Sequence, residues 1–495
     1  MTSSRLDRIT QQRLAKLEKL REQGINPYPH RFHRTHTAKE AATLLKQQET
    51  SGQTGTSPVD VAGRITAIRK MGKSSFLDLR DGSGKIQLLF QVTEESTAEQ
   101  RELFANLDIG DFIGVEGTLF RTKTGEPTIR VTDFAMLAKS LRPLPEKWHG
   151  LSDVETRYRQ RYLDLISNPE VRDTFKVRSQ VIASMRQFLN QRGFLEVETP
   201  ILQPEAGGAS ARPFVTHHNT LDQDFYLRIA TELHLKRLIV GGFDKVYELG
   251  RAFRNEGIDT KHNPEFTLLE SYEAYADYND VMKMVEEMVA GISQQVLGTT
   301  QVKFGEHTVN LNPPWQRLGL RESIQQSCGI DIVKYPKADL LRAEMQKLKI
   351  EADPEKNWAK LVDDLLTTCV EPKLIQPTFL IDYPVSMSPL AKTRPDNERV
   401  VERFEGFAGG LEIANAFTEL NDPLEQRERF VQQQKEHKAG DTEEETIDED
   451  FLQALEYGMP PTGGLGIGID RLVMLLTNQQ SIREVILFPQ LKEKP

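Results

Sequence analysis

The chain has 495 residues, which is too long for one ordinary domain, so we expect two or more domains, each with its own core. Its 38% hydrophobic and 27% charged residues are typical of a globular protein, and its net charge of −10 argues against nucleic-acid binding through bulk charge. No apolar run is as long as a membrane span, and no apolar N-terminal signal is present, which predicts a cytoplasmic protein. The two cysteines lack the spacing of a metal-binding knuckle.

The N-terminal residues 4–23 predict an amphipathic helix, with leucine and isoleucine near one stripe and basic side chains around the rest. A helix of this kind either lies on RNA or presents an ordinary solvated face, and the sequence leaves both open. The small, polar residues 48–58 are typical of a linker. We therefore assign residues 1–58 to a basic helix and a linker.

Residues 59–142 contain five short, alternating segments with a helical stretch between the third and the fourth, which predicts a five-stranded OB-fold β-barrel. Such barrels stack single-stranded bases on aromatic side chains. Phe76 on the second strand is a candidate for stacking, and Arg69 and Gln87 are candidates for phosphate or base-edge contacts. Alternation alone leaves open whether Phe76 faces outward or into the core.

The remaining chain predicts a connector over 143–168 and a second domain over 169–495. A long helix is followed by a strand over 194–199 and by Pro200, which cannot donate to a ladder and so places that strand at an edge or an interface. Residues 300–385 are less regular and are interpreted as an insertion.

The stretch 245–272, KVYELGRAFRNEGIDTKHNPEFTLLESY, predicts two strands joined by a polar loop. Its arginine, glutamate, histidine and phenylalanine suit a nucleotide, because a guanidinium binds phosphate as a bidentate fork and an aromatic ring stacks on a base. For Arg254 or Glu256 taken alone, an ordinary solvated surface role is an equally good interpretation.

Two later stretches carry further polar residues. In the strand-like residues 403–420, Asn415, Phe417 and Glu419 alternate onto one face, whereas Glu412 and Glu419 would lie on opposite faces of an unbroken strand. Residues 463–471 form a glycine-rich strand that leads into a helix with an arginine at the junction. Such a glycine pattern occurs in phosphate sites and in plain turns alike.

The order of three elements, helix-strand-proline, strand-FRNE-loop-strand and glycine-strand-arginine-helix, resembles the signature motifs of class II aminoacyl-tRNA synthetases. The barrel resembles the anticodon-binding domain of the subclass with the aspartate, asparagine and lysine enzymes. The segments RPLPEKWHGL, RYRQRYLDLI, GGASARPF, FRNEGI, HNPEF and GLGIGIDRL are similar to the bacterial type of class II lysyl-tRNA synthetase, over nearly the whole chain. The resemblance implies a multidomain α+β protein whose catalytic domain is an antiparallel β-sheet flanked by helices.

The resemblance also implies the residues that bind ATP. Arg254 and Arg471 would be catalytic, the first at the α-phosphate and the lysine carboxylate, the second at the adenine and near the γ-phosphate. The implied ATP-binding residues are Arg254, Glu256, His262, Asn263, Phe266 and Arg471. Two carboxylates, Glu405 and Glu412, would hold Mg²⁺ at the phosphates, because this ion takes oxygen ligands.

For the amino acid, the resemblance implies a pocket with a carboxylate at its far end, since an unpaired buried ammonium costs several kcal/mol. Glu419 with Tyr272 would take the side-chain ammonium, although a surface carboxylate is the plain alternative for Glu419. Glu232 and Gly208 would take the α-amino group. The full implied lysine-binding set is Gly208, Glu232, Arg254, Glu270, Tyr272, Asn415, Phe417 and Glu419.

The implied tRNA contacts lie in the barrel, where single-stranded anticodon bases can be read. The implied anticodon-binding residues are Arg69, Phe76, Gln87 and Glu126. The segment that ends at Pro200 resembles the family's dimer element, which implies a homodimer.

The expected activity is the ligation of L-lysine to tRNA(Lys) with ATP, through a lysyl-adenylate. The nearest alternative is a sibling enzyme for aspartate or asparagine, whose pocket would need a cationic partner. A relative that attaches a lysine-like group to a protein is a second alternative, but such relatives lack the barrel. A catalytically inactive, RNA-binding regulatory protein is the third, and Arg254, Glu256 and Arg471 argue against it.

Overall fold

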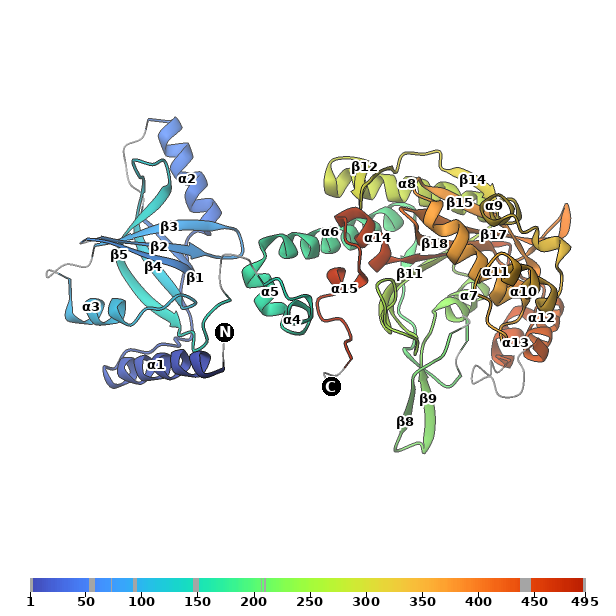
Figure 1. Ribbon diagram of the computed structural model, residues 1–495, viewed down its shortest axis with the longest axis horizontal. Coiled ribbons are helices and arrows are strands. Elements are labelled where there is room, and N and C mark those ends of the chain that lie inside the picture. Colours follow the sequence, from blue (N-terminus) through green and yellow to red (C-terminus); the bar gives the residue numbers. More distant parts are fainter. Residues whose placement is uncertain are drawn as a thin grey trace. The chain divides into compact units, whose positions relative to one another are not determined.

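The computed structural model describes residues 3–52, 58–72, 74–91, 96–145, 151–205, 207–208, 211–436 and 447–492. Two compact units divide the chain, Met1–Leu151 and Ser152–Pro495 (Figure 1). The first contains a small β-barrel and the second a large, mostly antiparallel sheet with helices. The predicted α+β class is therefore confirmed.

The barrel of the first unit is closed in the order β1-β2-β3-β5-β4. Its neighbouring strands are antiparallel except for β3 and β5, which are parallel. A helix, α3 (Ala98–Ala105), lies between the third and fourth strands, as predicted. This is the OB-fold arrangement. Its strands are β1 (Pro58–Met71), β2 (Ser74–Arg80), β3 (Lys85–Phe90), β4 (Phe112–Arg121) and β5 (Pro127–Ala138).

Two helices at the N-terminus pack on the barrel. The predicted α1 (Ser3–Glu22) contributes Leu20 to the barrel core, and α2 (Ala38–Thr50) contributes Ala41 and Leu45. The sequence pattern did not predict α2, although Thr37 and Glu40 form a capping box at its start. The predicted linker 48–58 therefore begins inside a helix, and its residues 53–57 lie outside the described residues.

The main sheet of the second unit has the strand order β14-β15-β17-β18-β19-β11-β10-β6, with β16 (Thr393–Arg394) paired to β17. All named pairs are antiparallel except β14 with β15 and β6 with β10. The strands are β6 (Leu195–Glu196), β10 (Lys245–Phe253), β11 (Glu265–Ala274), β14 (Gln316–Gly319), β15 (Thr378–Pro384), β17 (Asn397–Ala408), β18 (Leu411–Thr418) and β19 (Thr462–Gly468).

Helices cover both faces of this sheet. Successive side chains of a strand point to opposite faces, so neighbouring residues of one strand pack in different cores. Tyr247 and Leu269 pack in one core with α6 (Pro169–Gln191), α8 (Tyr278–Leu297) and α14 (Ile469–Thr477). Their neighbours Val246 and Tyr272 pack in another core with α7 (Glu232–Val240) and α13 (Glu449–Glu456). The residues predicted to bind ligands lie on this second face.

The region 300–385 contributes strands to the main sheet, namely β14 and β15, besides a separate hairpin of β12 (Gln301–Phe304) and β13 (His307–Asn310). Its helices α9 (Leu320–Cys328), α10 (Ala338–Lys347) and α11 (Trp358–Leu365) share one core with Leu380 and Phe407 of the sheet. The region is thus packed onto the sheet edge.

The predicted strand 194–199 is much shorter in the structure, where only Leu195–Glu196 pairs, in parallel with β10 at the sheet edge. Pro200 follows it and is exposed. A second hairpin, β8 (Val215–His218) with β9 (Gln223–Leu227), projects from this unit (Figure 1) and pairs with β7 (Leu202–Gln203). No helix among the described residues is long and apolar enough to span a membrane.

The connector region forms two short helices, α4 (Val154–Arg159) and α5 (Arg161–Ser167). The fully buried Arg161 guanidinium donates to Asp164 at 2.6 Å and to the carbonyl of Arg483 at 2.7 Å. Arg157 pairs at 2.9 Å with Glu484 on α15 (Ile482–Val485). These contacts attach the connector helices to the C-terminal segment of the same unit.

Candidate active site

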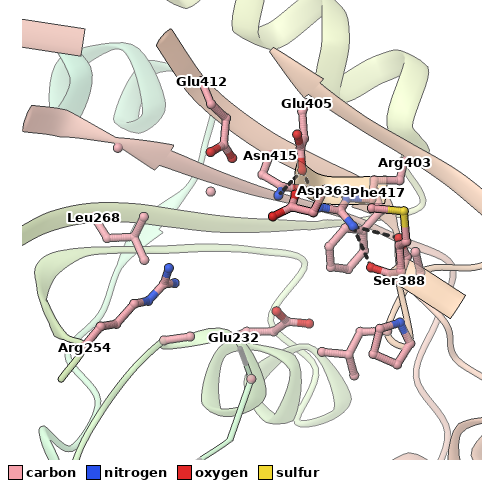
Figure 2. A pocket seen from close by; sticks show the side chains of 18 of the residues that line it. Glu232, Arg254, Leu268, Asp363, Ser388, Arg403, Glu405, Glu412, Asn415 and Phe417 are labelled. Carbon is pink, nitrogen blue, oxygen red and sulfur yellow. Dashed lines mark hydrogen bonds and ion pairs between the residues drawn. The ribbon is translucent and has the colours of Figure 1, made fainter. Parts of the chain in front are cut away.

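A pocket of about 1210 Å³ lies on the second face of the sheet, bordered by α7, α11 and α14. All residues predicted to bind ATP, lysine or Mg²⁺ line it, from Gly208 to Arg471. In Figure 2, Glu405 and Glu412 lie on one side of the pocket, and Arg254 and Glu232 face it from the other. The volume exceeds that of a typical single-ligand site, so it has room for two substrates side by side.

The predicted hairpin is formed by β10 and β11, whose register places Phe253 opposite Glu265. Arg254 follows β10, and its backbone N–H donates to the carbonyl of Pro264 at 2.8 Å. Its guanidinium lies 5.1 Å from the ring centroid of Phe266 on β11. The hairpin therefore presents a cation and an aromatic face together, which are the two groups that a nucleotide needs.

Arg471 lies at the start of α14, directly after β19, the strand that pairs with β11 of this hairpin. Its guanidinium donates to the Glu412 carboxylate at 2.7 Å and lies 3.2 Å from Nε2 of His262. The other ring nitrogen of His262, Nδ1, contacts Asp259 at 2.9 Å. The loop of the hairpin thereby contacts the start of α14, which follows the glycine-rich strand, at the pocket wall.

The other two residues predicted for ATP differ in character. Glu256 is exposed at the pocket wall, whereas Asn263 is buried. The Asn263 amide donates to the carbonyl of Glu265 at 2.6 Å and its oxygen accepts from the N–H of Gln490 at 3.3 Å. These bonds show that Asn263 also shapes the loop.

Glu412 lines the pocket because β18 contains a bulge. The pairing with β17 runs from Phe407 opposite Glu412 to Gly406 opposite Ala414, so one residue of β18 has no partner. A bulge of this kind reverses the side-chain alternation. Glu412 and Asn415 consequently face the same pocket, which the unbroken strand of the sequence analysis did not allow.

Glu405 on β17 is buried and accepts three hydrogen bonds. Tyr383 donates at 2.7 Å, Arg403 at 2.5 Å and Asn415 at 3.3 Å. Burial raises the pKa of Glu405 to about 7, and the guanidinium of Arg403 opposes this rise. Arg403 also donates to Ser388 at 2.8 Å, as Figure 2 shows. The sequence offered no signal for Arg403 beyond its place before Glu405.

At the opposite end of the pocket, Glu419 is fully buried, so it is not a surface carboxylate. Its Oε2 forms an ion pair with the ammonium of Lys236, which is also fully buried. The same ammonium donates to Oε1 of Glu232 at 2.6 Å. Lys236 was not among the predicted residues, although Glu232 and Lys236 have the i, i+4 spacing of a helix pair.

Gly464 on β19 makes room for the Glu419 carboxylate. A Cβ atom at Gly464 would lie 1.8 Å from Oε1 of Glu419 and 2.7 Å from the Tyr272 ring. Burial raises the pKa of the Tyr272 hydroxyl well above its usual range, so this group stays a neutral hydrogen-bond donor beside the carboxylate.

Glu270 and Gly208 complete this end. The N–H of Thr231 donates to Glu270 at 2.7 Å, yet burial raises the pKa of Glu270 to about 7. Gly208 has a φ of +87°, a conformation that favours glycine, and a Cβ there would meet the side chain of Ala230 at 3.4 Å. Its neighbours 206, 209 and 210 lie outside the described residues.

Comparison with known proteins gives the family. Residues 153–492 match the model of tRNA synthetases class II (D, K and N), and residues 59–137 match that of the OB-fold nucleic acid binding domain. The chain belongs to the class II tRNA synthetases (D, K and N). It is 59% identical over 487 residues to a lysine–tRNA ligase of Dehalococcoides mccartyi, covering 98% of each chain. Lysine–tRNA ligases of Pelotomaculum thermopropionicum and Carboxydothermus hydrogenoformans are 53% and 52% identical, over 99% and 100% of this chain and 96% and 100% of theirs.

The barrel of this class II synthetase brings the four predicted anticodon residues to one outer face. Arg69 on β1 pairs opposite Phe76 on β2. Gln87 on β3 pairs opposite Asp78, which is two residues beyond Phe76 and binds Arg69 at 2.7 Å. Phe76 is half-buried and is not part of the barrel core, so its ring lies on the outer face of the barrel.

Glu126 precedes β5 and is connected to this face through Lys85, which lies 3.3 Å from Glu126 and 3.8 Å from Asp78. Thr128 on β5 donates to the Gln87 side chain at 3.0 Å. The outer face therefore combines one ring with polar side chains held in a network, which suits a stacked base with a readable edge.

The N-terminal helix of the synthetase uses part of its basic face for internal contacts. Arg13 donates to the carbonyls of Ser140 at 2.9 Å and Ile109 at 2.8 Å, and Lys16 pairs with Asp108 at 2.7 Å. These side chains attach α1 to the barrel, as does Lys19, which pairs with Glu102.

Proposed function

We propose that the protein activates L-lysine with ATP to lysyl-adenylate and pyrophosphate, and then transfers lysine to the 3′ end of tRNA(Lys). The observation that carries this proposal is the fully buried Glu419 in the same pocket as Arg254 and Phe266. This buried carboxylate favours an ammonium, because Lys236 contacts only Oε2 of Glu419 and a neutral or anionic substrate side chain would leave Oε1 without a charged donor among the described residues. The lysine–tRNA ligases named above are consistent with it.

In the first step, the lysine carboxylate would attack the α-phosphorus of ATP, and the bond from that phosphorus to the pyrophosphate oxygen would break. The substrate supplies the nucleophile, so the protein needs only to orient the reactants and to neutralise developing charge. Arg254 would contact the α-phosphate and the lysine carboxylate. Phe266 and Arg471 would enclose the adenine, with Glu256 at its amino group and His262 and Asn263 near the phosphates.

The lysine would lie between two carboxylates at the closed end of the pocket. Glu419 and Tyr272 would bind its side-chain ammonium, and Glu232 with Gly208 its α-amino group. Glu270, Asn415 and Phe417 would supply the remaining contacts. In the second step, a hydroxyl of the terminal tRNA ribose would attack the carbonyl carbon of the adenylate, and AMP would leave.

Mg²⁺ is the cofactor we propose. In phosphate sites this ion takes oxygen ligands and usually one or two carboxylates, with the rest from phosphates and water. Glu405 and Glu412 supply two carboxylates at one wall, and the described residues contain no group of three acidic, histidine or cysteine side chains that would hold a metal alone. This donor set fits an ion shared with ATP. When bound, the ion would neutralise phosphate charge.

A sibling activity on aspartate or asparagine fits the pocket less well. Its far end holds Glu419, Glu232 and Glu270, which are all buried, and Lys236 is already paired with two of them. A short acidic side chain would add a negative charge to this end. A non-catalytic, RNA-binding role also fits less well, because it would not explain a pocket that is lined by Arg254, Phe266 and Arg471.

The barrel would read the anticodon, with Phe76 stacking on a base and Gln87 binding the edge of the central uridine. Arg69 and Glu126 would complete the contact. A class II synthetase acts where tRNA is charged, so we place the protein in the cytoplasm.

A homodimer is the proposed assembly. Leu195, Ile201 and Leu202, which flank Pro200, are 47%, 44% and 47% exposed. Val215 and Leu221 on the projecting β8–β9 hairpin are exposed as well. Large apolar side chains that are exposed together on neighbouring segments are typical of an interface.

Amino-acid-dependent exchange of radiolabelled pyrophosphate into ATP, measured for each of the twenty amino acids, tests the proposal. We expect exchange with L-lysine and at most a trace with the others. Exchange that depends only on aspartate or asparagine would establish the sibling activity, and no exchange with any amino acid would favour the regulatory role.

A further inference from the structure

Lys236 stands out because it is a buried charge that the proposed reaction does not use directly. Its ammonium lies between Oε1 of Glu232, at 2.6 Å, and Oε2 of Glu419, and all three side chains are at most 9% exposed. The ring centroids of Phe417 and Phe451 lie 5.5 and 5.8 Å from it. Its surroundings are therefore two carboxylates and two aromatic rings.

Stability alone does not explain such a pair. A buried salt bridge costs desolvation on both sides, and apolar residues of similar size are often as stabilising or more so. An i, i+4 pair on a helix surface would be exposed and weak. Lys236 does not line the pocket itself, but both of its partners, Glu232 and Glu419, line the pocket end proposed for the substrate, which points to a role in binding.

The oxygens that Lys236 leaves free are informative. It contacts one oxygen of each carboxylate, which leaves Oε2 of Glu232 and Oε1 of Glu419 for a further donor. Among the described residues, no group donates a hydrogen bond to Oε1 of Glu419. That atom lies against Gly464 and the Tyr272 ring, where the substrate ammonium is expected.

The charges at this end can be counted. Glu232 and Lys236 come from α7, Glu270 and Tyr272 from β11, and Glu419 follows β18. At a pH above the raised pKa values of Glu270 and Glu419, where the carboxyls are ionised, three negative charges face one ammonium. The remaining two negative charges match the α- and side-chain ammonium groups of lysine.

Resting on the proposed function, we propose that Lys236 is a positioning and specificity-determining residue: its ammonium ties Glu232 and Glu419 together and sets the pocket's charge to accept two further ammonium groups. Without it, the two carboxylates would repel each other and lose their fixed separation. Burial raises the pKa of Glu419 and Lys236 counteracts this, so a variant without the ammonium would bind lysine only after losing a proton.

The test compares Lys236→Met with the wild type in full-length protein, by lysine-dependent pyrophosphate exchange between pH 6 and 9. We expect the KM for lysine to rise about 10- to 100-fold, the range for losing a charged hydrogen bond. We also expect the pH at which this KM falls to move upward, while the KM for ATP changes less than twofold. An unchanged lysine KM and pH profile would overturn the proposal.

Lys139→Met is the matched control. Lys139 is also fully buried and pairs with two carboxylates, Asp108 at 2.6 Å and Asp111 at 2.8 Å, but it lies in the barrel. Its loss should leave the lysine KM of the exchange reaction unchanged. An equal rise of the lysine KM in both variants would show a general structural effect and overturn the proposal.

Two further variants separate the effect of the Lys236 charge from the effect of its side-chain shape. They also test the proposal if Lys236→Met folds poorly. Lys236→Gln keeps a donor without the charge, and Lys236→Arg keeps the charge. We expect the pH shift in the glutamine variant and its absence in the arginine variant, and equal pH profiles would refute the charge argument. The exchange by wild-type protein with lysine tests the proposed function itself, so the two ideas fail separately.

Discussion

The barrel face and the pocket use the same kinds of side chain under opposite conditions. In the barrel, the Arg69 side chain is 50% exposed and pairs across the neighbouring strand with Asp78, whose side chain is 11% exposed. In the pocket, Lys236 and Glu419 are both 0% exposed. Exposed pairs contribute about 0–1 kcal/mol because water screens them, whereas breaking a buried pair costs about 3–5 kcal/mol. We therefore expect charge in the pocket to select a ligand and charge on the barrel face mainly to orient one.

The largest effect should follow from Glu419→Gln. We expect kcat/KM for lysine in the exchange reaction to fall by about 150- to 4000-fold, because the substrate ammonium would lose a buried counter-charge worth about 3–5 kcal/mol. The fold should survive with a lower free energy of unfolding, since the substitution breaks one buried ion pair but Lys236 still pairs with Glu232. Pyrophosphate exchange and thermal unfolding measure the two quantities.

Glu456→Gln is the control for this change, because Glu456 is an exposed carboxylate on the end of α13. It should leave both exchange and unfolding unchanged. If Glu419→Gln kept wild-type lysine kinetics, Glu419 would not be part of the lysine site and the contrast between the two regions would disappear.

The sequence could predict much of the pocket because its parts follow local rules. Alternation and turn residues place the β10–β11 hairpin, and the glycine-rich β19 leads into α14 as expected. The facing of Glu412 was unpredictable, because it depends on a bulge created by pairing with β17. Lys236 was missed because only the fold shows that the helix carrying it faces Glu419.

In the barrel, local sequence patterns also predicted only part of the structure. Five alternating strands predict the fold, but the direction of Phe76 depends on how the barrel closes. The short β6 shows the converse, because the six residues 194–199 have the apolar and acidic pattern of a strand while only two of them form ladder pairs with β10. Pairing and closure are tertiary facts, so alternation fixes the existence of a strand better than its length or face.

A smaller effect should follow from Phe76→Ala. Loss of one stacked base costs about 1–3 kcal/mol, so we expect kcat/KM for tRNA charging to fall by about 5- to 150-fold. Exchange with lysine should stay at the wild-type level, because Phe76 lies in the barrel and the pocket is built from the second unit.

Phe120→Ala is the control, because it removes the ring of another half-buried phenylalanine of the barrel. Aminoacylation with purified tRNA and pyrophosphate exchange should be measured on the same preparations. Equal losses of both reactions in Phe76→Ala would mean that the ring supports the fold and does not bind tRNA.

The smallest effect should be a pH dependence that the pocket shows and the barrel face does not. Burial raises the pKa of Glu270 to about 7, so its carboxyl is neutral below that pH and attracts an ammonium only above it. The KM for lysine should therefore fall as the pH rises from 6 to 8, by up to about tenfold per pH unit below the pKa. The KM for tRNA should vary less over this range.

Glu270→Gln identifies the group responsible. The glutamine is neutral at every pH, so the variant should keep a high lysine KM and lose its pH dependence between 6 and 8. Stability should respond in the opposite direction: because the folded pKa is raised, protonation favours the folded state, and the free energy of unfolding of the wild type should decrease as the pH rises through 7. Glu270→Gln should lessen that decrease. If the variant kept the full pH dependence of the lysine KM, the titrating group would be another pocket carboxyl, with Glu419 the first candidate because burial raises its pKa as well.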